Sequence, residues 1–309
     1  MKHTWLKYLT RISLPIAILL SVVLLAAWVP SLLSGSIGDV CATAGLMMCN
    51  AALLTFMIRQ TGGSRDYNGL PYIISMLAVT AIPALHGYWQ GQLVTLMVLF
   101  IIYSIHNAYM EQDNMHDAFR NTLILYIGSL IVNDAIWLIP FMWIGYGVLG
   151  TFHLRTWLSS MMALSVAVLW TAVLVYLGWV EMPFADMLHR TWLLTSPGDW
   201  NAWSQIGMLA LTAIFMIVAA LHSDRDSIRR RKLLALFGWV TLFATISTLF
   251  PAKETLFPIV QSALSGIAVI YLLQQPTEGR GRMFIFYIVC CALLYALPYV
   301  PLLIEWWPF

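Results

Sequence analysis

The sequence is a succession of apolar runs, each about as long as a membrane-spanning helix. They fall at residues 14–33, 39–58, 71–88, 92–110, 120–150, 157–179, 201–221, 234–250, 257–273 and 283–304. One helical crossing needs about 20 apolar residues. Only 10% of the 309 residues are charged, whereas soluble domains carry about 25%. These runs predict a single all-α domain over residues 1–309, a polytopic transmembrane helix bundle with no soluble domain.

The run at 120–150 determines the sidedness of everything after it. It lies between Arg120 and Arg155, is too long for one span, and is interrupted once by Asn133 and Asp134. If the run is a hairpin and the N-terminus is cytoplasmic, only Arg190 and Lys253 of the 16 basic residues lie outside. A single crossing would divide the basic residues evenly, so the positive-inside rule favours the hairpin. The sequence thus predicts about 11 spans, or nine if the hairpin is re-entrant, and an outside C-terminus.

The strongest cytoplasmic marker is the segment 222–232. Its basic residues are Arg225, Arg229, Arg230, Arg231 and Lys232. Such a patch fixes topology at an anionic lipid surface, or it serves as a docking surface for a membrane or cytoplasmic protein. The net charge of +2 is too balanced to indicate nucleic-acid binding. The expected partners are therefore the lipid bilayer and a protein that binds through 222–232.

The longest outside segment, residues 178–200, has an amphipathic pattern. Phe184, Met187, Leu188 and Trp192 recur at helical spacing, and Asp186 pairs with Arg190 four residues later on the opposite face. This pattern predicts an interfacial helix that lies on the outer surface of the membrane. A substrate lid is the alternative interpretation.

Polar groups at membrane depth are expensive, so each is a candidate site. Asp134 and Asn133 lie at the predicted tip of the hairpin, where Asp134 either caps a helix that begins at Ala135 or contributes to a substrate or ion site. Asp39, in the first outside loop, and His86, at the outer end of the third span, complete this candidate set. The mid-span amides of Asn50 and Gln261 predict hydrogen bonds between helices instead.

Motifs for nucleotide binding, serine hydrolysis, zinc proteolysis and dinucleotide binding do not occur in the sequence. The four cysteines lack metal-ligand spacing, so we expect neither a metal nor a cofactor. Cys41, Gly45 and Cys49 place small residues four apart, a spacing that favours close packing against another helix of the same chain.

Three stretches between residues 92 and 175 carry a family resemblance. These are LVTLMVLFIIYSIHNAYM, then HDAFRNTLILYIGSLI, and finally IWLIPFMWIGYGVLGTFHLRTWLSSMM. They resemble an uncharacterised family of polytopic inner-membrane proteins from Bacteroidota, with the hairpin entry at His116–Phe119 and its exit at Arg155–Trp157. The resemblance implies a bacterial inner-membrane location and transfers no functional residues.

Two hypotheses of function follow from these patterns. The first is a non-catalytic integral membrane component of the cell envelope, either a scaffold or a translocation-type partner. The second is an enzyme or carrier for a lipid-linked, polyprenyl-type substrate, with Asp134, Asp39, His86 and the 178–199 helix around an outward cavity. The second hypothesis requires at least two of these polar groups to converge, whereas the first predicts that they are dispersed and packed.

Overall fold

α-Helices and short 3₁₀ helices are the regular secondary structure of the described residues, and helices can satisfy their backbone hydrogen bonds within a membrane. The computed structural model describes residues 12–34, 36–60, 69–108, 114–178, 200–222, 227–249 and 256–301. The N-terminal half of the bundle contains α2 (Leu14–Leu25), η1 (Ala26–Trp28), α3 (Val29–Ser34), α4 (Ile37–Gln60), α5 (Leu70–Thr80), η3 (Pro83–Leu85) and α6 (Trp89–Asn107).

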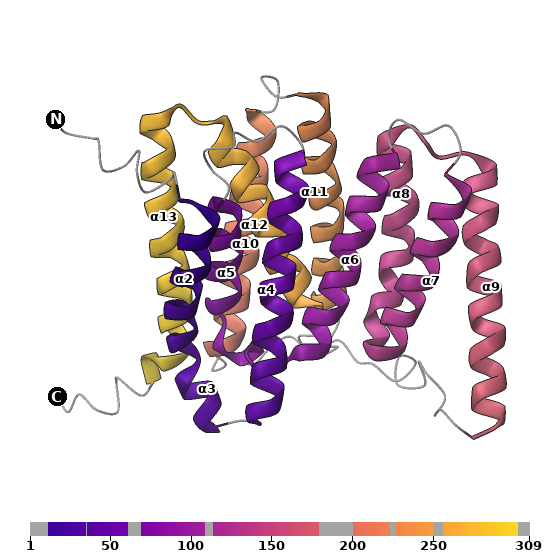
Figure 1. Ribbon diagram of the computed structural model, residues 1–309, viewed down its shortest axis with the longest axis horizontal. Helices are drawn as coiled ribbons and strands as arrows, with labels where there is room; N and C mark the ends of the chain where they lie inside the picture. The colour runs from indigo at the N-terminus through magenta and orange to yellow at the C-terminus, as the bar shows by residue number, and fades with distance from the viewer. Residues whose placement is uncertain are drawn as a thin grey trace.

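The remaining elements begin with a short hairpin. They are α7 (Met115–Ile131), η5 (Asn133–Leu138), α8 (Ile139–Leu149), α9 (Leu154–Tyr176), α10 (Trp200–Leu221), α11 (Ile228–Leu249), α12 (Phe257–Gln274), α13 (Thr277–Ala296) and η8 (Leu297–Tyr299). The helices run side by side in an elongated bundle, with α9 at one edge and α2 and α13 toward the other (Figure 1).

Seven helical segments within the described ranges are long and apolar enough to cross a membrane. They are Leu14–Leu33, Ile37–Gln60, Trp89–Asn107, Leu154–Tyr176, Trp203–Leu221, Phe257–Gln274 and Gly279–Tyr299. Their exposed surfaces are rich in Leu, Ile, Val and Trp, as a lipid-facing surface requires. The protein is therefore a multi-pass membrane protein built from α-helices.

The core is organised around α12. Every residue of α12 from Phe257 to Leu272 is buried, and α12 packs against α4, α5, α6, α10, α11 and α13. Its sequence has no charged residue and several small ones, so neighbouring helices can approach on all sides. Gly266 shows how close this packing is, because a Cβ atom there would lie 2.6 Å from the ring of Phe237 in α11.

The stretch between Arg120 and Arg155 folds back on itself as predicted. Asn121 in α7 bonds Tyr146 in α8, and Thr122 contacts Met142, so the partners advance in opposite directions along the two helices. The turn between them is η5. The hairpin ends at Gly150, whose positive φ of 73° suits glycine and closes the C-terminus of α8.

The third predicted span is shorter than expected. The sequence predicts a helix over 71–88, but α5 ends at Thr80 and a separate 3₁₀ turn begins at Pro83. Pro83 has no N–H group and forces the residue before it out of the helical region. Ile82 accordingly has extended backbone angles, φ −125° and ψ 96°.

The predicted packing role of Cys41, Gly45 and Cys49 is wrong. Both cysteines are exposed, and a Cβ atom added at Gly45 would meet no heavy atom within 4 Å. The buried face of α4 instead contains Val40, Met47, Asn50, Ala51 and Leu54. The larger apolar side chains bury more surface against α5 and α6 than the small stripe could, so they determine which face turns inward.

α9 is attached to the rest of the bundle mainly through α7. Its buried face consists of Thr156, Ser160, Ala163, Ala167 and Thr171, which are all small and recur every three or four residues. The hydroxyl groups of Thr122 and Ser160 lie 2.7 Å apart, and the Tyr126 hydroxyl donates to Thr171 at 2.9 Å. The two helices therefore run in the same direction, at a close separation that small side chains permit.

We expect Ala163→Leu to detach or distort α9. Ala163 has no exposed surface, and inserting a large side chain into a packed contact costs about 1–3 kcal/mol. The measurement is the thermal unfolding midpoint of the full-length protein in detergent. Met162→Leu is the matched control, because Met162 is adjacent to Ala163 in the sequence and its side chain is 67% exposed. Equal midpoints for the two variants would contradict a tight α7–α9 contact.

Candidate polar sites within the helix bundle

Asp134 is almost completely buried, with 1% of its surface exposed, at the tip of the α7–α8 hairpin. The helical segment begins at Asn133, two residues before the predicted start, and Val132 occupies the N-cap position. Asp134 therefore belongs to the first turn and is not the N-cap. A carboxylate in a first turn is still favoured by the unpaired N–H groups there.

Asp39 lies in the first turn of α4 and is exposed. Its carbonyl oxygen accepts a hydrogen bond from the Thr43 hydroxyl at 2.7 Å. The carboxylate is thus placed at the positive end of the helix dipole and faces away from the bundle interior. This position stabilises the helix start without any ligand.

His86 is fully buried and held from three directions. Its Nε2 lies 3.3 Å from the Thr80 carbonyl oxygen, so Nε2 carries the proton and donates it. Nδ1 then accepts from the Ser31 hydroxyl at 3.0 Å. The ring also stacks on Trp28, with centroids 4.0 Å apart and planes 7° apart. His86 therefore joins α3 to the turn after α5, and both of its nitrogens are already used.

The candidate residues do not form a common site in the described parts of the chain. Hydrogen bonds and ion pairs there do not join Asp39, His86 and Asp134 to one another. Groups of three or more His, Cys, Asp or Glu side chains that could hold a metal ion are also absent from the described ranges. Asp186, Arg190 and Trp192 of the predicted interfacial helix, and Arg225, lie outside the described residues.

The basic residues collect at one end of the bundle, here called the cationic end. Contacts between residues place the ends of α4, α6, α8 and α12 at the same level as the starts of α7, α9, α11 and α13. Every described Lys and Arg belongs to these ends: Arg59, Arg120, Arg155, Arg229, Arg230, Arg231, Lys232, Arg280 and Arg282. Asp39, His86 and Asp134 lie toward the other end.

Two of these cations close the C-termini of neighbouring helices. Lys232 Nζ donates to the Leu149 carbonyl oxygen of α8 at 3.0 Å. Arg280 is buried and donates through Nε to the Leu272 carbonyl oxygen of α12 at 2.9 Å. A cation is favourable at a helix C-terminus, where the last carbonyl groups lack partners. Within the predicted basic patch, Arg229 and Arg231 remain exposed.

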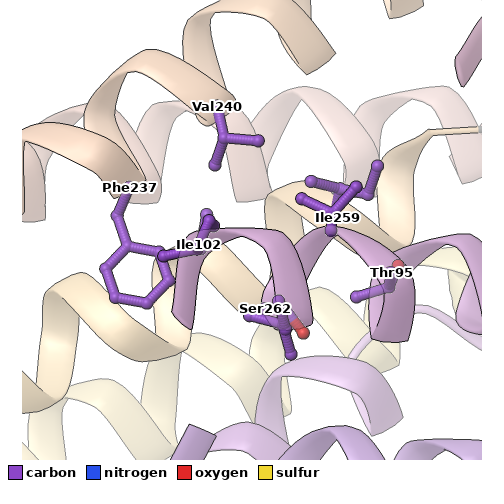
Figure 2. A pocket seen from close by; sticks show the side chains of 9 residues that line it. Thr95, Ile102, Phe237, Val240, Ile259 and Ser262 are labelled. Carbon is purple, nitrogen blue, oxygen red and sulfur yellow. The ribbon is translucent and has the colours of Figure 1, made fainter. Parts of the chain in front are cut away.

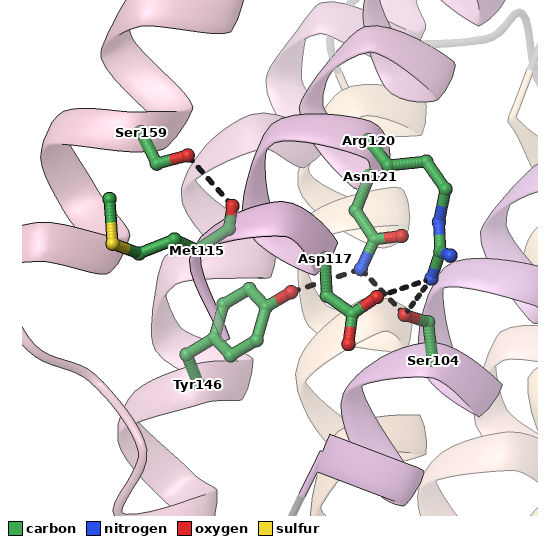
Figure 3. A network of polar contacts seen from close by, with 7 residues as sticks. All are labelled: Ser104, Met115, Asp117, Arg120, Asn121, Tyr146 and Ser159. Carbon is green, nitrogen blue, oxygen red and sulfur yellow. Dashed lines mark hydrogen bonds and ion pairs between the residues drawn. The ribbon is translucent and has the colours of Figure 1, made fainter. Parts of the chain in front are cut away.

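A polar network at the cationic end was not predicted from the sequence (Figure 3). Buried Asn121 donates to Ser104 of α6 at 3.1 Å and to the Tyr146 hydroxyl of α8 at 3.0 Å. Arg120 bonds Ser104 at 2.9 Å and pairs with Asp117 at 2.6 Å. The network holds the hairpin against α6. The sequence feature that could have indicated this network is the polar amide of Asn121, which follows Arg120 directly at the start of the apolar run 120–150.

The mid-span amides form the predicted interhelical hydrogen bonds. Asn50 Nδ2 of α4 donates to the side-chain oxygen of Gln92 in α6 at 2.9 Å and to its backbone oxygen at 3.0 Å. Gln261 Nε2 of α12 donates to the Ala78 carbonyl oxygen of α5 at 3.0 Å. These bonds tie the central helix and its neighbours together at membrane depth.

A narrow void lies between α6, α11 and α12 (Figure 2). About 160 Å³ between its lining atoms is unfilled, part of it open to the outside, and the gap is too narrow to admit a water molecule. Its lining is apolar except for Thr95 and Ser262, and the Thr95 hydroxyl is bonded to its own helix. None of Asp39, His86, Asn133 and Asp134 lines it. This void is a packing defect rather than a substrate cavity.

Comparison with known proteins supplies no further assignment. No protein-family description, curated protein or solved structure matches the chain.

We expect the protein to lose stability as the pH falls from about 6.5 to about 4. Burial is the main cause that lowers the pKa of His86 from 6.5 to about 4, and its bond to the Thr80 carbonyl opposes this shift in part. Below pH 6.5 the unfolded chain binds a proton that the folded chain excludes, so stability present above pH 6.5 is lost progressively. The full shift corresponds to roughly 3 kcal/mol.

The measurement is the unfolding midpoint in detergent at successive pH values. His86→Gln should lower the midpoint at pH 7.5, because the Trp28 stack and the ring geometry are lost, and should flatten the slope below pH 6.5. His153→Gln is the matched control, since His153 is exposed. An unchanged acid slope in His86→Gln would show that other groups determine it.

Proposed function

We propose that the protein is a non-catalytic integral component of the bacterial cell envelope, a scaffold or translocation-type partner in the cytoplasmic membrane. The observation that supports this proposal is the dispersal of its candidate polar residues. Asp39 faces outward at a helix start, His86 has both nitrogens bonded, and Asp134 is enclosed at a hairpin tip. Catalysis would require such groups to converge on one substrate.

The proposed topology has the cationic end in the cytoplasm and 11 crossings. Segregation of all described cations to one end supports this orientation under the positive-inside rule. For the hairpin, the 17 residues of α7 supply about 25 Å of helix. This length is close to the thickness of the hydrocarbon core, which a tilted pair of helices and η5 would span. The bacterial inner-membrane location also accords with the Bacteroidota family resemblance.

The proposed partner surface is the basic start of α11, within residues 222–232. Arg229 and Arg231 are exposed there, whereas Lys232 is engaged with α8. A patch that keeps free cations beside the membrane suits an acidic surface on a membrane or cytoplasmic protein, in addition to the anionic lipid headgroups around it.

Cysteine labelling of intact cells tests the orientation. In a background with the four native cysteines replaced by alanine, Asp39→Cys should react with a membrane-impermeant maleimide from outside. Arg231→Cys should react only after the cells are permeabilised. The reverse pattern would overturn the orientation. Trp137→Cys, at a tip residue that is 56% exposed, should be labelled from outside if the hairpin crosses fully, and from neither side if it is re-entrant.

Complementation of a deletion strain tests the absence of catalysis. Asp134→Asn and Asp39→Asn each remove a charge while conserving shape, so a scaffold should retain envelope integrity, measured as growth in detergent, at wild-type protein levels. Ala163→Leu is the control, because it should lose function by disrupting the fold. Loss of function in Asp134→Asn and Asp39→Asn with normal protein levels would favour the alternative, an enzyme or carrier for a lipid-linked substrate.

A further inference from the structure

The first membrane-length segment is interrupted away from the cationic end. α2 ends at Leu25 and α3 begins at Val29, with the 3₁₀ turn η1 between them. Pro30 explains this break, because it has no N–H group to donate to the Ala26 carbonyl one turn back. That carbonyl accepts from the Val29 N–H instead, in the tighter 3₁₀ pattern. A short 3₁₀ stretch inside a helix often marks a hinge, so α3 is joined to α2 at a point where the chain can bend.

α3 itself buries little surface against the bundle. Three of its residues are exposed, namely Val29, Pro30 and Leu33, whereas Ser31 and Leu32 are partly buried. Trp28, directly before α3, is by contrast only 1% exposed. The position of residues 28–34, here called the flap, therefore depends on a small number of specific contacts.

His86 makes contacts that hold the flap. Its ring stacks on Trp28, with the ring centroids 4.0 Å apart, and its Nδ1 lies 3.0 Å from the Ser31 hydroxyl oxygen. Its Nε2 donates to the Thr80 carbonyl oxygen at the end of α5. One fully buried side chain thus joins the flap to α5.

These contacts require a neutral His86 ring. In that state Nε2 donates to Thr80 and Nδ1 accepts from Ser31, whereas a protonated ring carries a hydrogen on both nitrogens. Even if the Ser31 hydroxyl turned to accept, one neutral hydroxyl would not replace the water that a buried charge loses. Protonation therefore destabilises the closed position of the flap.

An opposite charge does not compensate a protonated His86 in the described ranges. The titratable side chains on the surrounding elements are Asp39 at the start of α4, Tyr88 before α6 and Tyr295 on α13. The hydrogen bonds and ion pairs of the described residues do not join His86 to any of these three. Burial accordingly lowers the pKa of His86 to about 4, although the bond to the Thr80 carbonyl opposes the shift in part.

We propose that residues 28–34 form an acid-released flap, which neutral His86 holds closed and protonated His86 releases. Trp28 and Ser31 both contact the ring from this one short segment, so moving the segment opens the ring to water without unpacking a whole helix. η1 supplies the hinge. Tyr295 of α13 fixes the base of the flap, because its hydroxyl donates to the Ala27 carbonyl oxygen at 2.7 Å.

The pH window follows from the two states of His86. The released ring has its ordinary pKa of 6.5, and the ring held by the flap has a pKa of about 4. Above pH 6.5 both states are neutral, so the full stability of the closed flap is present. As the pH falls to about 4, proton binding favours the open state, and the closed-to-open ratio falls by roughly 300-fold.

Hydrogen–deuterium exchange of the wild-type protein in nanodiscs tests this release. The rates for residues 28–34 are measured between pH 7.5 and pH 4.5 and divided by the intrinsic rate at each pH. We expect the corrected rate to rise by roughly 70-fold in the flap at pH 4.5, with no rise in α7. An unchanged rate in the flap would overturn the proposal. An equal rise in the flap and in α7 would also overturn it, because the acid effect would then be global unfolding.

A variant without a titrating group provides the matched test. His86→Phe keeps an aromatic ring beside Trp28 but binds no proton, so the corrected exchange rate of the flap should not depend on pH. His153→Gln is the control, since His153 is exposed, and it should keep the wild-type rise. A rise of wild-type size in His86→Phe would contradict the assignment to His86. The wild-type measurement decides the proposal even if His86→Phe is unstable.

Discussion

The burial of α12 is the contact on which the rest of the structure depends. In a membrane, an interior helix gains little from the hydrophobic effect, because lipid is as apolar as its own side chains. Close packing and interhelical hydrogen bonds must hold it instead. α12 meets both requirements, with small residues such as Ser262, Ser265 and Gly266 along its length and with the Gln261 bond to α5. The other helices are arranged around this element.

Cations contribute to the same construction at one end of the bundle. Arg280 closes the C-terminus of α12, and Lys232 closes that of α8. Each residue thus satisfies carbonyl groups that a helix end leaves unpaired. Lys232 and Arg280 therefore cap helices at the end of the bundle where all the described cations lie.

Buried polar residues join the helices and turns of the bundle to one another. Asn121 and Tyr146 hold the hairpin against α6, and His86 fastens α3 to the turn after α5. In both cases the polar group joins neighbouring elements of the bundle.

The sequence alone determined the all-helical class, the approximate position of most helices, the hairpin and the interhelical role of Asn50 and Gln261. These features follow from local hydropathy and from the cost of polar groups in lipid, both of which are readable along the chain. The sequence-based prediction was wrong about the end of α5, because Pro83 ends the helix although the apolar run continues. It was also wrong in assigning a packing role to the small residues at Cys41, Gly45 and Cys49.

Only the tertiary structure decided which helix face turns inward, which polar groups meet and which are left with an unpaired atom. Asn121 bonds Tyr146, 25 positions away in the sequence, and Gln261 bonds the Ala78 carbonyl, 183 positions away. Nothing local to either residue selects its partner. In a chain whose helices are apolar on every side, hydropathy cannot rank the faces, so the fit of side chains between helices determines the arrangement.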